Sequence, residues 1–396
     1  MRRIAVAAAN HLSSSRCLSL LLTAGVLAAS CSEDTPAADD PSSKARAVLP
    51  IQIDGSNEAR EMTLYSYFPK DVVARPGDTL RFTVSSIGEP HTVTFGTLVD
   101  SAMAAVKNAN LRSVEDIFFK EPPEMTVLPS IFGPLPTQKP ENQAAGQPCY
   151  LDSGKPPIPD ACPKREQPEF DGTQSYFNSG YLENTHTYEV KLSKRIPPGT
   201  YNYINVVYRG LMAGSITVVD ENTPRPTAKQ VADKGAEELR LAVGNMSTDL
   251  TAAKRATPDK GLAGFISPSA PTNVGMTFEP RDGRIPVGGS VTWSLYLCHT
   301  ITFNPPQGAF GDLKHLPDGS VRLNPIPYAP AQTTEPALLS GTIDAGRWDG
   351  RGYFNSGALC ALTPGALTYK MTFSQAGTYQ LVCLFHPSMT ARITVA

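Results

Sequence analysis

Apolar and polar residues alternate along several short segments of the chain, which is the pattern of strands that bury one face. Toward the C-terminus the apolar positions with this spacing are Val291, Trp293, Leu295 and Leu297, then Tyr369, Met371 and Phe373, then Tyr379, Leu381 and Cys383. Toward the N-terminus they are Leu80, Phe82 and Val84, then Tyr188, Val190 and Leu192. Turns rich in Gly and Pro separate these segments, so the pattern predicts an all-β chain of Greek-key β-sandwiches.

Three blocks of sequence occur twice in the same order, which indicates a duplicated domain. Residues 91–95 (HTVTF), 176–180 (YFNSG) and 199–201 (GTY) match residues 299–303 (HTITF), 353–357 (YFNSG) and 377–379 (GTY). We therefore expect two sandwiches, one over residues 48–220 and one over residues 272–396.

A helix is expected between the two sandwiches. Apolar residues recur there at helical spacing, at Ala232, Ala236, Leu239, Val243 and Met246. Thr227 and Gln230 have the spacing of a capping box, and Pro258 would end the helix. The pattern predicts a helical linker over residues 221–271.

The first 30 residues have the features of an export signal. Arginines precede an apolar run over residues 17–29, which is too short for a stable membrane span. Small residues then lead directly to Cys31, an order that resembles a bacterial lipobox, although an ordinary cleaved signal is the alternative. We expect a lipid anchor on Cys31, a flexible tether over residues 31–47, and a place in the bacterial cell envelope, periplasmic or surface-exposed.

The candidate chemistry is that of a metal site. A net charge of −2 offers no cation excess for phosphates, so we expect no nucleic-acid partner. Cys383, His386 and Met389 fall within seven residues at the end of a predicted strand, and His299 begins an earlier one. A thiolate, two imidazoles and a weak thioether are the ligand set of blue copper. Zinc prefers a closed set of Cys, His and carboxylate ligands, so it fits this set less well.

Residues 383–389 (CLFHPSM), with residues 299–303 upstream, resemble the cupredoxin family, most closely its plastocyanin and amicyanin type. The resemblance implies two cupredoxin-like sandwiches, of which the second holds one type 1 copper. It implies that His299, Cys383 and His386 are equatorial ligands and that Met389 is the axial ligand. It also implies an exposed edge of His386 as the electron port, with a redox protein docking near it.

The first copy keeps His91 but lacks the rest of this set. Asn205 stands at the thiolate position, Tyr208 stands at the imidazole position, and Met212 lies one residue beyond the thioether spacing. Because a blue site needs the thiolate, we expect a degenerate, metal-free domain that serves as a spacer or docking module. Weak binding by His91, Met212 and His186 is the alternative.

The seven cysteines are an odd number, so they cannot all be paired. Cys149 and Cys162 share a Pro-rich loop and are expected to form a disulfide, as exported proteins can. Cys298 and Cys360 are both absent from the first copy, which supports a second pair. The signal peptide and the lipid account for two more cysteines, so Cys383 is left unpaired.

These features predict an electron-transfer protein in which one copper cycles between Cu(II) and Cu(I), more a carrier than an enzyme. Two alternatives stay open. One is a lipoprotein that handles or delivers copper. The other is a copper oxidoreductase such as a nitrite reductase, which would need a second copper centre. The chain has no His-x-His pair of the kind that multicopper oxidases carry.

Overall fold

Paired β-strands are the main regular secondary structure in a computed structural model, which confirms the all-β prediction. The structure describes residues 45–86, 89–111, 116, 120–126, 128, 167–183, 185–270, 272–315, 321–329 and 340–396. The expected signal, residues 31–44 of the expected tether and the lipid site at Cys31 lie outside these residues, and so does the expected Cys149–Cys162 pair.

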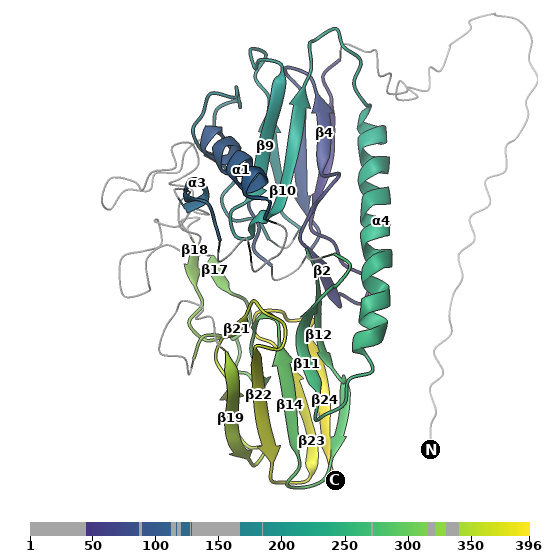
Figure 1. Cartoon of the computed structure of the whole chain (residues 1–396), viewed down its shortest axis with the longest axis vertical. Helices are drawn as coiled ribbons and strands as arrows, with labels where there is room; N and C mark the ends of the chain where they lie inside the picture. Colours follow the sequence, from purple (N-terminus) through teal and green to yellow (C-terminus); the bar gives the residue numbers. More distant parts are fainter. Residues whose placement is uncertain are drawn as a thin grey trace, which may run out of the picture. The chain divides into compact units, whose positions relative to one another are not determined.

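The first sandwich consists of two sheets, with strand orders β3-β1-β5-β8 and β4-β10-β9-β6-β7 (Figure 1). The strands of the first sheet are β1 (Val48–Ile53), β3 (Tyr67–Phe68), β5 (Thr79–Val84) and β8 (Thr187–Lys191). Those of the second are β4 (Asp71–Ala74), β6 (Thr94–Phe95), β7 (Phe177–Asn178), β9 (Gly199–Asn205) and β10 (Arg209–Val218). Phe82, Phe95 and Tyr203 meet edge-on or tilted between the sheets, fully buried. Aromatic packing of this kind fills the space between two pleated surfaces.

The second sandwich repeats this arrangement, with strand orders β19-β22-β14-β11-β12-β2 and β13-β24-β23-β16-β20. The strands of its first sheet are β2 (Met62–Leu64), β11 (Gly261–Ile266), β12 (Asn273–Glu279), β14 (Ser290–Leu295), β19 (Gly341–Trp348) and β22 (Leu367–Phe373). Those of its second sheet are β13 (Asp282–Ile285), β16 (Thr302–Phe303), β20 (Phe354–Asn355), β23 (Gly377–Val382) and β24 (Thr390–Val395). Two short pairs complete the set, β15 (Leu297–His299) with β21 (Leu359–Ala361) and β17 (Leu313–His315) with β18 (Val321–Leu323).

Matching strands pair in the same way in both sandwiches. The parallel pair β1–β5 corresponds to β11–β14, and the pair β6–β7 corresponds to β16–β20. β11 lies inside the expected linker of residues 221–271, so apart from β2 the strands of the second sandwich begin at Gly261 and not at residue 272. This strand was not predicted because its six residues, GLAGFI, show no alternation of apolar and polar positions.

Asp171-Gly172 and Asp349-Gly350 also repeat, and each glycine packs against the tyrosine of the Gly-Thr-Tyr block in its own copy. Gly172 and Gly350 both have a φ of +81°, and an added Cβ would lie within 2.4 Å of a ring carbon of Tyr201 or 2.2 Å of one of Tyr379. Each tyrosine hydroxyl donates to a backbone carbonyl four residues upstream. Only glycine allows the turn to pass so close to the ring, so the Asp-Gly sequence and the tyrosine of the Gly-Thr-Tyr block occur together in both copies.

The helix α4 (Ala228–Ala253) follows the first sandwich, as predicted. Thr227 caps it, and Thr227 and Gln230 form both bonds of the predicted capping box. Its buried side is formed by Val231, Gly235, Met246 and Leu250. Ala232 and Ala236 are exposed, so the buried side lies one residue from the predicted positions at the start of the helix.

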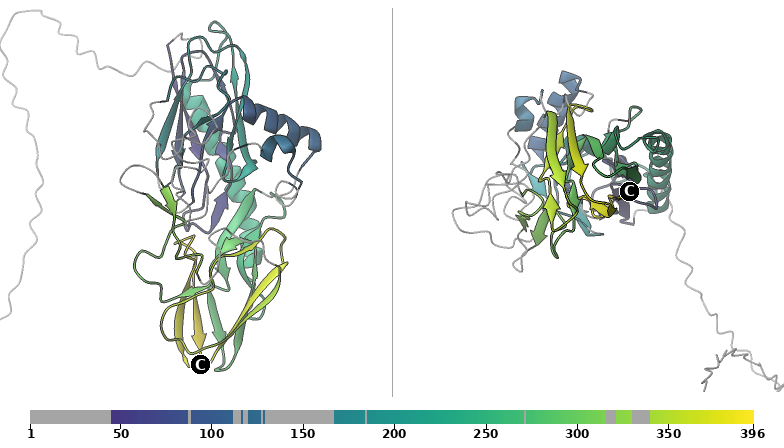
Figure 2. Two further views of the ribbon diagram at one scale, coloured as in Figure 1. Left: turned by 90° about the vertical axis from the view of Figure 1, so that its left-hand side faces the viewer. Right: turned by 90° about the horizontal axis from the view of Figure 1, so that it is seen from below.

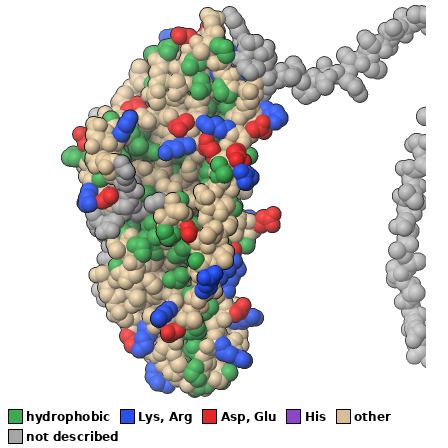
Figure 3. Space-filling view, turned by 45° about the vertical axis from the view of Figure 1, so that its right-hand side comes forward, with side chains coloured by type: hydrophobic (Ala, Val, Ile, Leu, Met, Phe, Trp, Pro, Cys, Tyr) green, Lys and Arg blue, Asp and Glu red, His purple; other side chains and the backbone are tan. Residues whose placement is uncertain are grey.

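Two smaller helices, α1 (Thr97–Ala109) and α3 (Pro123–Thr126), lie outside the first sandwich (Figures 1 and 2). Val99, Ala102 and Val106 of α1 pack with Ile204 of β9 in a separate apolar cluster. In the described residues, no helix is long and apolar enough to span a bilayer. Acidic and basic side chains are interspersed on the face that Figure 3 shows.

A strand from the first half completes the sheet of the second half. β2 pairs with β12 in antiparallel register, Thr63 opposite Val274, and the Met276 N–H donates to the Glu61 carbonyl at 2.8 Å. α4 packs over this junction, where its Met246 contacts the apolar cluster that contains Met62. The two sandwiches therefore form a continuous hydrogen-bonded structure.

Candidate metal centre

Three segments bring the predicted ligands of the second sandwich together. β15 ends at His299, β23 runs directly into Cys383, and the loop that follows carries His386 before Met389 leads into β24. The loop is closed by its own backbone, because the Cys383 N–H donates to the Met389 carbonyl at 3.0 Å and the Met389 N–H donates to the His386 carbonyl at 2.8 Å. A short loop held in this way presents its side chains with little freedom.

The donor atoms of three residues converge on one point. The Cys383 Sγ lies 3.5 Å from the His386 Nδ1 and 3.8 Å from the His299 Nδ1, and the two Nδ1 atoms are 3.1 Å apart. All three atoms lie within 4.8 Å of one another. Met389 is fully buried in the apolar cluster that contains Cys383. Separations of this size let one ion reach every donor at about 2.0–2.3 Å.

The electrostatics of the cluster favour a thiolate. Burial by itself raises the pKa of Cys383, but the imidazoles of His386 and His299 outweigh it and hold the pKa well below its usual range. Burial lowers the pKa of His299. Burial also acts to lower the pKa of His386, but the Glu89 carboxylate and the Cys383 sulfur raise it to about 10. A cation is therefore favoured between these groups.

Thr300, next to His299, supports the sulfur and the loop. Its N–H points to the Cys383 Sγ at 3.4 Å, and its Oγ1 accepts from the Leu384 N–H at 2.8 Å. A thiolate that accepts a backbone hydrogen bond is stabilised in its charged form. The threonine of the repeated His-Thr block therefore has a role at the site.

The predicted disulfide between Cys298 and Cys360 is present. The two residues face each other in the β15–β21 pair, where His299 stands opposite Leu359. Cys360 is fully buried, so the bridge fixes the strand that presents His299 from inside the core.

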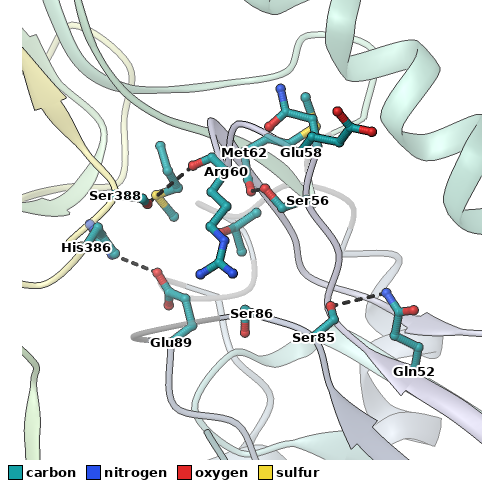
Figure 4. A pocket seen from close by; sticks show the side chains of 13 residues that line it. Gln52, Ser56, Glu58, Arg60, Met62, Ser85, Ser86, Glu89, His386 and Ser388 are labelled. Atoms are coloured by element: carbon teal, nitrogen blue, oxygen red, sulfur yellow. Dashed lines mark hydrogen bonds and ion pairs between the residues drawn. The ribbon is translucent and has the colours of Figure 1, made fainter. Parts of the chain in front are cut away.

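His386 is covered by a residue of the first sandwich. Its Nε2 forms an ion pair with the Glu89 Oε1 at 2.8 Å, and only 12 % of its side chain is exposed (Figure 4). The other oxygen of Glu89 accepts a hydrogen bond from the Tyr208 hydroxyl. The exposed edge implied by the resemblance is thus largely closed. The remaining opening is a polar cleft of about 270 Å³, whose lining includes Arg60 and Ser388.

The matching place in the first sandwich is filled by hydrogen bonds. The Asn205 amide contacts the His91 Nδ1 at 2.9 Å and donates to the Met212 Sδ at 3.3 Å. The His91 Nε2 lies 2.9 Å from the Ser86 Oγ and 3.1 Å from the Asp54 Oδ2. The amide at the thiolate position therefore uses the face of His91 that a metal would need.

A bulge in β10 explains why Met212 sits one residue beyond the family spacing. The β9–β10 register shifts between Arg209 and Ala213, and Ile204 pairs with Ala213 where the equivalent Val382 pairs with Thr390, so the segment after Asn205 is one residue longer than the segment after Cys383. Thr92 repeats the contacts of Thr300, because its N–H donates to the Asn205 Oδ1 at 3.2 Å and its Oγ1 accepts from the Val206 N–H. Asn205 and Cys383 are thus structurally equivalent.

Sequence reasoning missed three residues beside the metal centre. The repeated His-Thr block contained a signal for Thr300. Nothing in the sequence linked Glu89 to His386, which lies in the other copy. Gly264 has a φ of +71°, and an added Cβ would stand 2.2 Å from the His299 Nε2. Gly264 lies in β11, which the sequence pattern did not predict, so its contact with His299 could not be predicted either.

Comparison with known proteins gives structural likenesses only. No protein-family model matches the chain, and no curated protein matches it. A reduced amicyanin variant is 10% identical, with a TM-score of 0.20, over 43% of this chain and 82% of that one. An auracyanin from the photosynthetic bacterium Roseiflexus castenholzii is 15% identical, with a TM-score of 0.23, over 44% of this chain and 98% of that one.

A purple cupredoxin from Nitrosopumilus maritimus is 17% identical, with a TM-score of 0.18, over 35% of this chain and 98% of that one. One further amicyanin structure is of a reduced Cu(I) form. The chain is therefore similar to solved cupredoxins over less than half of its length.

Proposed function

We propose that the chain binds one type 1 copper through His299, Cys383, His386 and Met389 and transfers single electrons. The observation that carries this proposal is the convergence of a thiolate sulfur and two imidazole Nδ1 atoms within 4.8 Å, inside a core that also buries Met389. Soft sulfur with two imidazoles and a thioether is the donor set that suits copper in electron-transfer sites.

The protein's part in this function is to hold the donors still. Bound copper would supply a Cu(II)/Cu(I) couple at this place. The hydrogen bonds that close the loop at Met389, the support from Thr300 and the disulfide at Cys298 all restrict movement of the donors. A donor set that moves little between two charge states lowers the reorganisation that electron transfer requires.

Burial favours a carrier over an oxidoreductase that binds substrate at the metal. His299, Cys383 and Met389 are fully buried, so a substrate cannot reach the ion from their side. Copper stoichiometry tests this part of the proposal: one copper per chain supports a carrier, and two would indicate a second centre.

The direct test is absorption and EPR spectroscopy of the copper-loaded protein. We expect an intense thiolate-to-copper band in the wild type and its loss in Cys383→Ser. Asn205→Ser changes the equivalent position of the first sandwich and is the matched control, in which the band should remain. A wild type without the band, or a band that survives in Cys383→Ser, contradicts the proposal.

We further propose a cell-envelope location with lipid on Cys31, and a redox protein that approaches near His386. The order of residues before Cys31 supports the first point, and the cleft that reaches His386 supports the second. Labelling cells with a radioactive fatty acid tests the anchor, since Cys31→Ala should lose both the label and the membrane fraction. Label retained in Cys31→Ala would contradict it.

A further inference from the structure

A carboxylate of the first sandwich is bound to a proposed copper ligand of the second. Glu89 lies two residues before His91, and its Oε1 is 2.8 Å from the Nε2 of His386. The carboxylate side chain is only 7 % exposed. Figure 4 shows it reaching from the first sandwich toward the imidazole. A buried carboxylate is costly unless its oxygens are paired, so this contact is a built feature of the interface.

Both oxygens of Glu89 have partners. The second oxygen accepts from Tyr208, whose ring stacks on Tyr65 with the centroids 4.1 Å apart. Tyr208 is the residue at the imidazole position of the first copy. The position that lost a metal ligand in the first sandwich therefore holds the carboxylate that contacts a proposed ligand in the second.

The interface around Glu89 is held by further contacts. β2 and β12 pair across it, Ser388 within the loop of residues 383–389 donates to the Arg60 carbonyl at 3.4 Å, and Glu61 forms an ion pair with Arg281 at 3.2 Å. These contacts fix the backbone on both sides, so the distance between Glu89 and His386 does not depend on the ion pair alone.

We propose that Glu89 is a positioning residue for the copper centre, which makes the first sandwich part of the metal site. The inference rests on the proposed function. A carboxylate 2.8 Å from Nε2 favours the proton on that nitrogen and leaves the Nδ1 lone pair for the metal, as outer partners of ligating histidines do. The negative charge also favours the more highly charged Cu(II). In the described residues, the Nε2 of His299 has no hydrogen-bond partner, so only His386 is held in this way.

The test compares Glu89→Gln and Glu89→Ala with the wild type, each fully loaded with copper. Glu89→Gln keeps an acceptor but removes the charge, so the type 1 spectrum should remain while the ratio of Cu(II) to Cu(I) affinity falls about tenfold, which is a rise of about 59 mV in potential. Glu89→Ala removes the acceptor too, so copper affinity should fall about 10- to 100-fold and the EPR parameters should change.

Glu58→Gln is the matched control, since Glu58 lines the same cleft and is exposed. It should keep both the potential and the affinity of the wild type. Thermal unfolding of the metal-free proteins checks that each variant is folded, and Glu89→Gln keeps the proposal testable where Glu89→Ala does not fold.

The outcomes separate this inference from the proposed function. A wild type without a type 1 spectrum contradicts the proposed function itself. A wild type with that spectrum, and Glu89 variants that match Glu58→Gln in potential, affinity and EPR, overturns the inference alone. Variants that lose only thermal stability, with an unchanged potential, overturn it as well, because Glu89 would then act only in the interface.

Discussion

Removing the disulfide between Cys298 and Cys360 should destabilise the second sandwich and weaken its copper site. The bridge joins two strands whose residues already face each other, so its loss leaves the β15–β21 pairing possible but unconstrained. The perturbation is the double variant Cys298→Ala/Cys360→Ala, which avoids a free thiol beside copper.

The magnitude follows from the length of chain that the bridge closes. The two cysteines are 62 residues apart. In the chain-entropy treatment, closing a loop of that length lowers the entropy of the unfolded chain and so stabilises the folded state by about 4 kcal/mol. With an m-value of about 4 kcal/mol/M, the midpoint of unfolding in guanidinium chloride should fall by about 1 M.

Tryptophan fluorescence of the metal-free protein is a selective assay. The chain has two tryptophans, Trp293 and Trp348, and both lie in the core of the second sandwich, so their signal reports that sandwich. Reduced wild-type protein is the control, because it loses the bond and keeps every side chain. A midpoint that moves by less than about 0.2 M in both the variant and the reduced protein would refute the entropic reasoning.

Two further predictions concern single positions. Gly264→Ala should weaken copper binding and cost about 1–3 kcal/mol in unfolding free energy, because its Cβ would meet His299 at a φ of +71°. Gly346→Ala has a similar φ of +74° with open space around it, so in copper titrations it should bind normally; equal losses of affinity would contradict the contact with His299. Burial raises the pKa of the Asp312 carboxyl to about 6. The folded protein therefore binds the carboxyl proton more tightly than the unfolded chain does, and the unfolding free energy should fall as the pH rises from about 4 to 6. Asp312→Asn should abolish this fall in thermal midpoints measured across that range, and an unchanged slope would show that another group is responsible.

Local sequence patterns predicted the parts of the site that lie within one loop or one repeated block. Cys383, His386 and Met389 are close in the chain. Their spacing within one short loop can be read directly from the sequence. The repeat located His299, because His91 begins the same block in the first copy. Alternation predicted strands such as β14, whose positions are alternately buried and partly exposed.

Contacts between the two copies could not be predicted in this way. Glu89 and His386 are nearly 300 positions apart, and neither repeat contains the pair within itself. β2 has only three residues, all buried, which is too few for a periodic pattern. Both features depend on how two folded surfaces meet. Contacts between such surfaces produce no periodic pattern in a single sequence.

The pairing of β2 with β12 has a consequence for how the chain acquires its structure. Every residue of β12 is buried, so without β2 and α4 this strand would be an unpaired and uncovered edge, the kind that recruits other chains into aggregates. Synthesis delivers β2 about 200 residues before β12, and domains commonly fold in the order in which they are made. The first half would then cover the edge of β12 as the second half folds. We expect a separately expressed C-terminal half to aggregate.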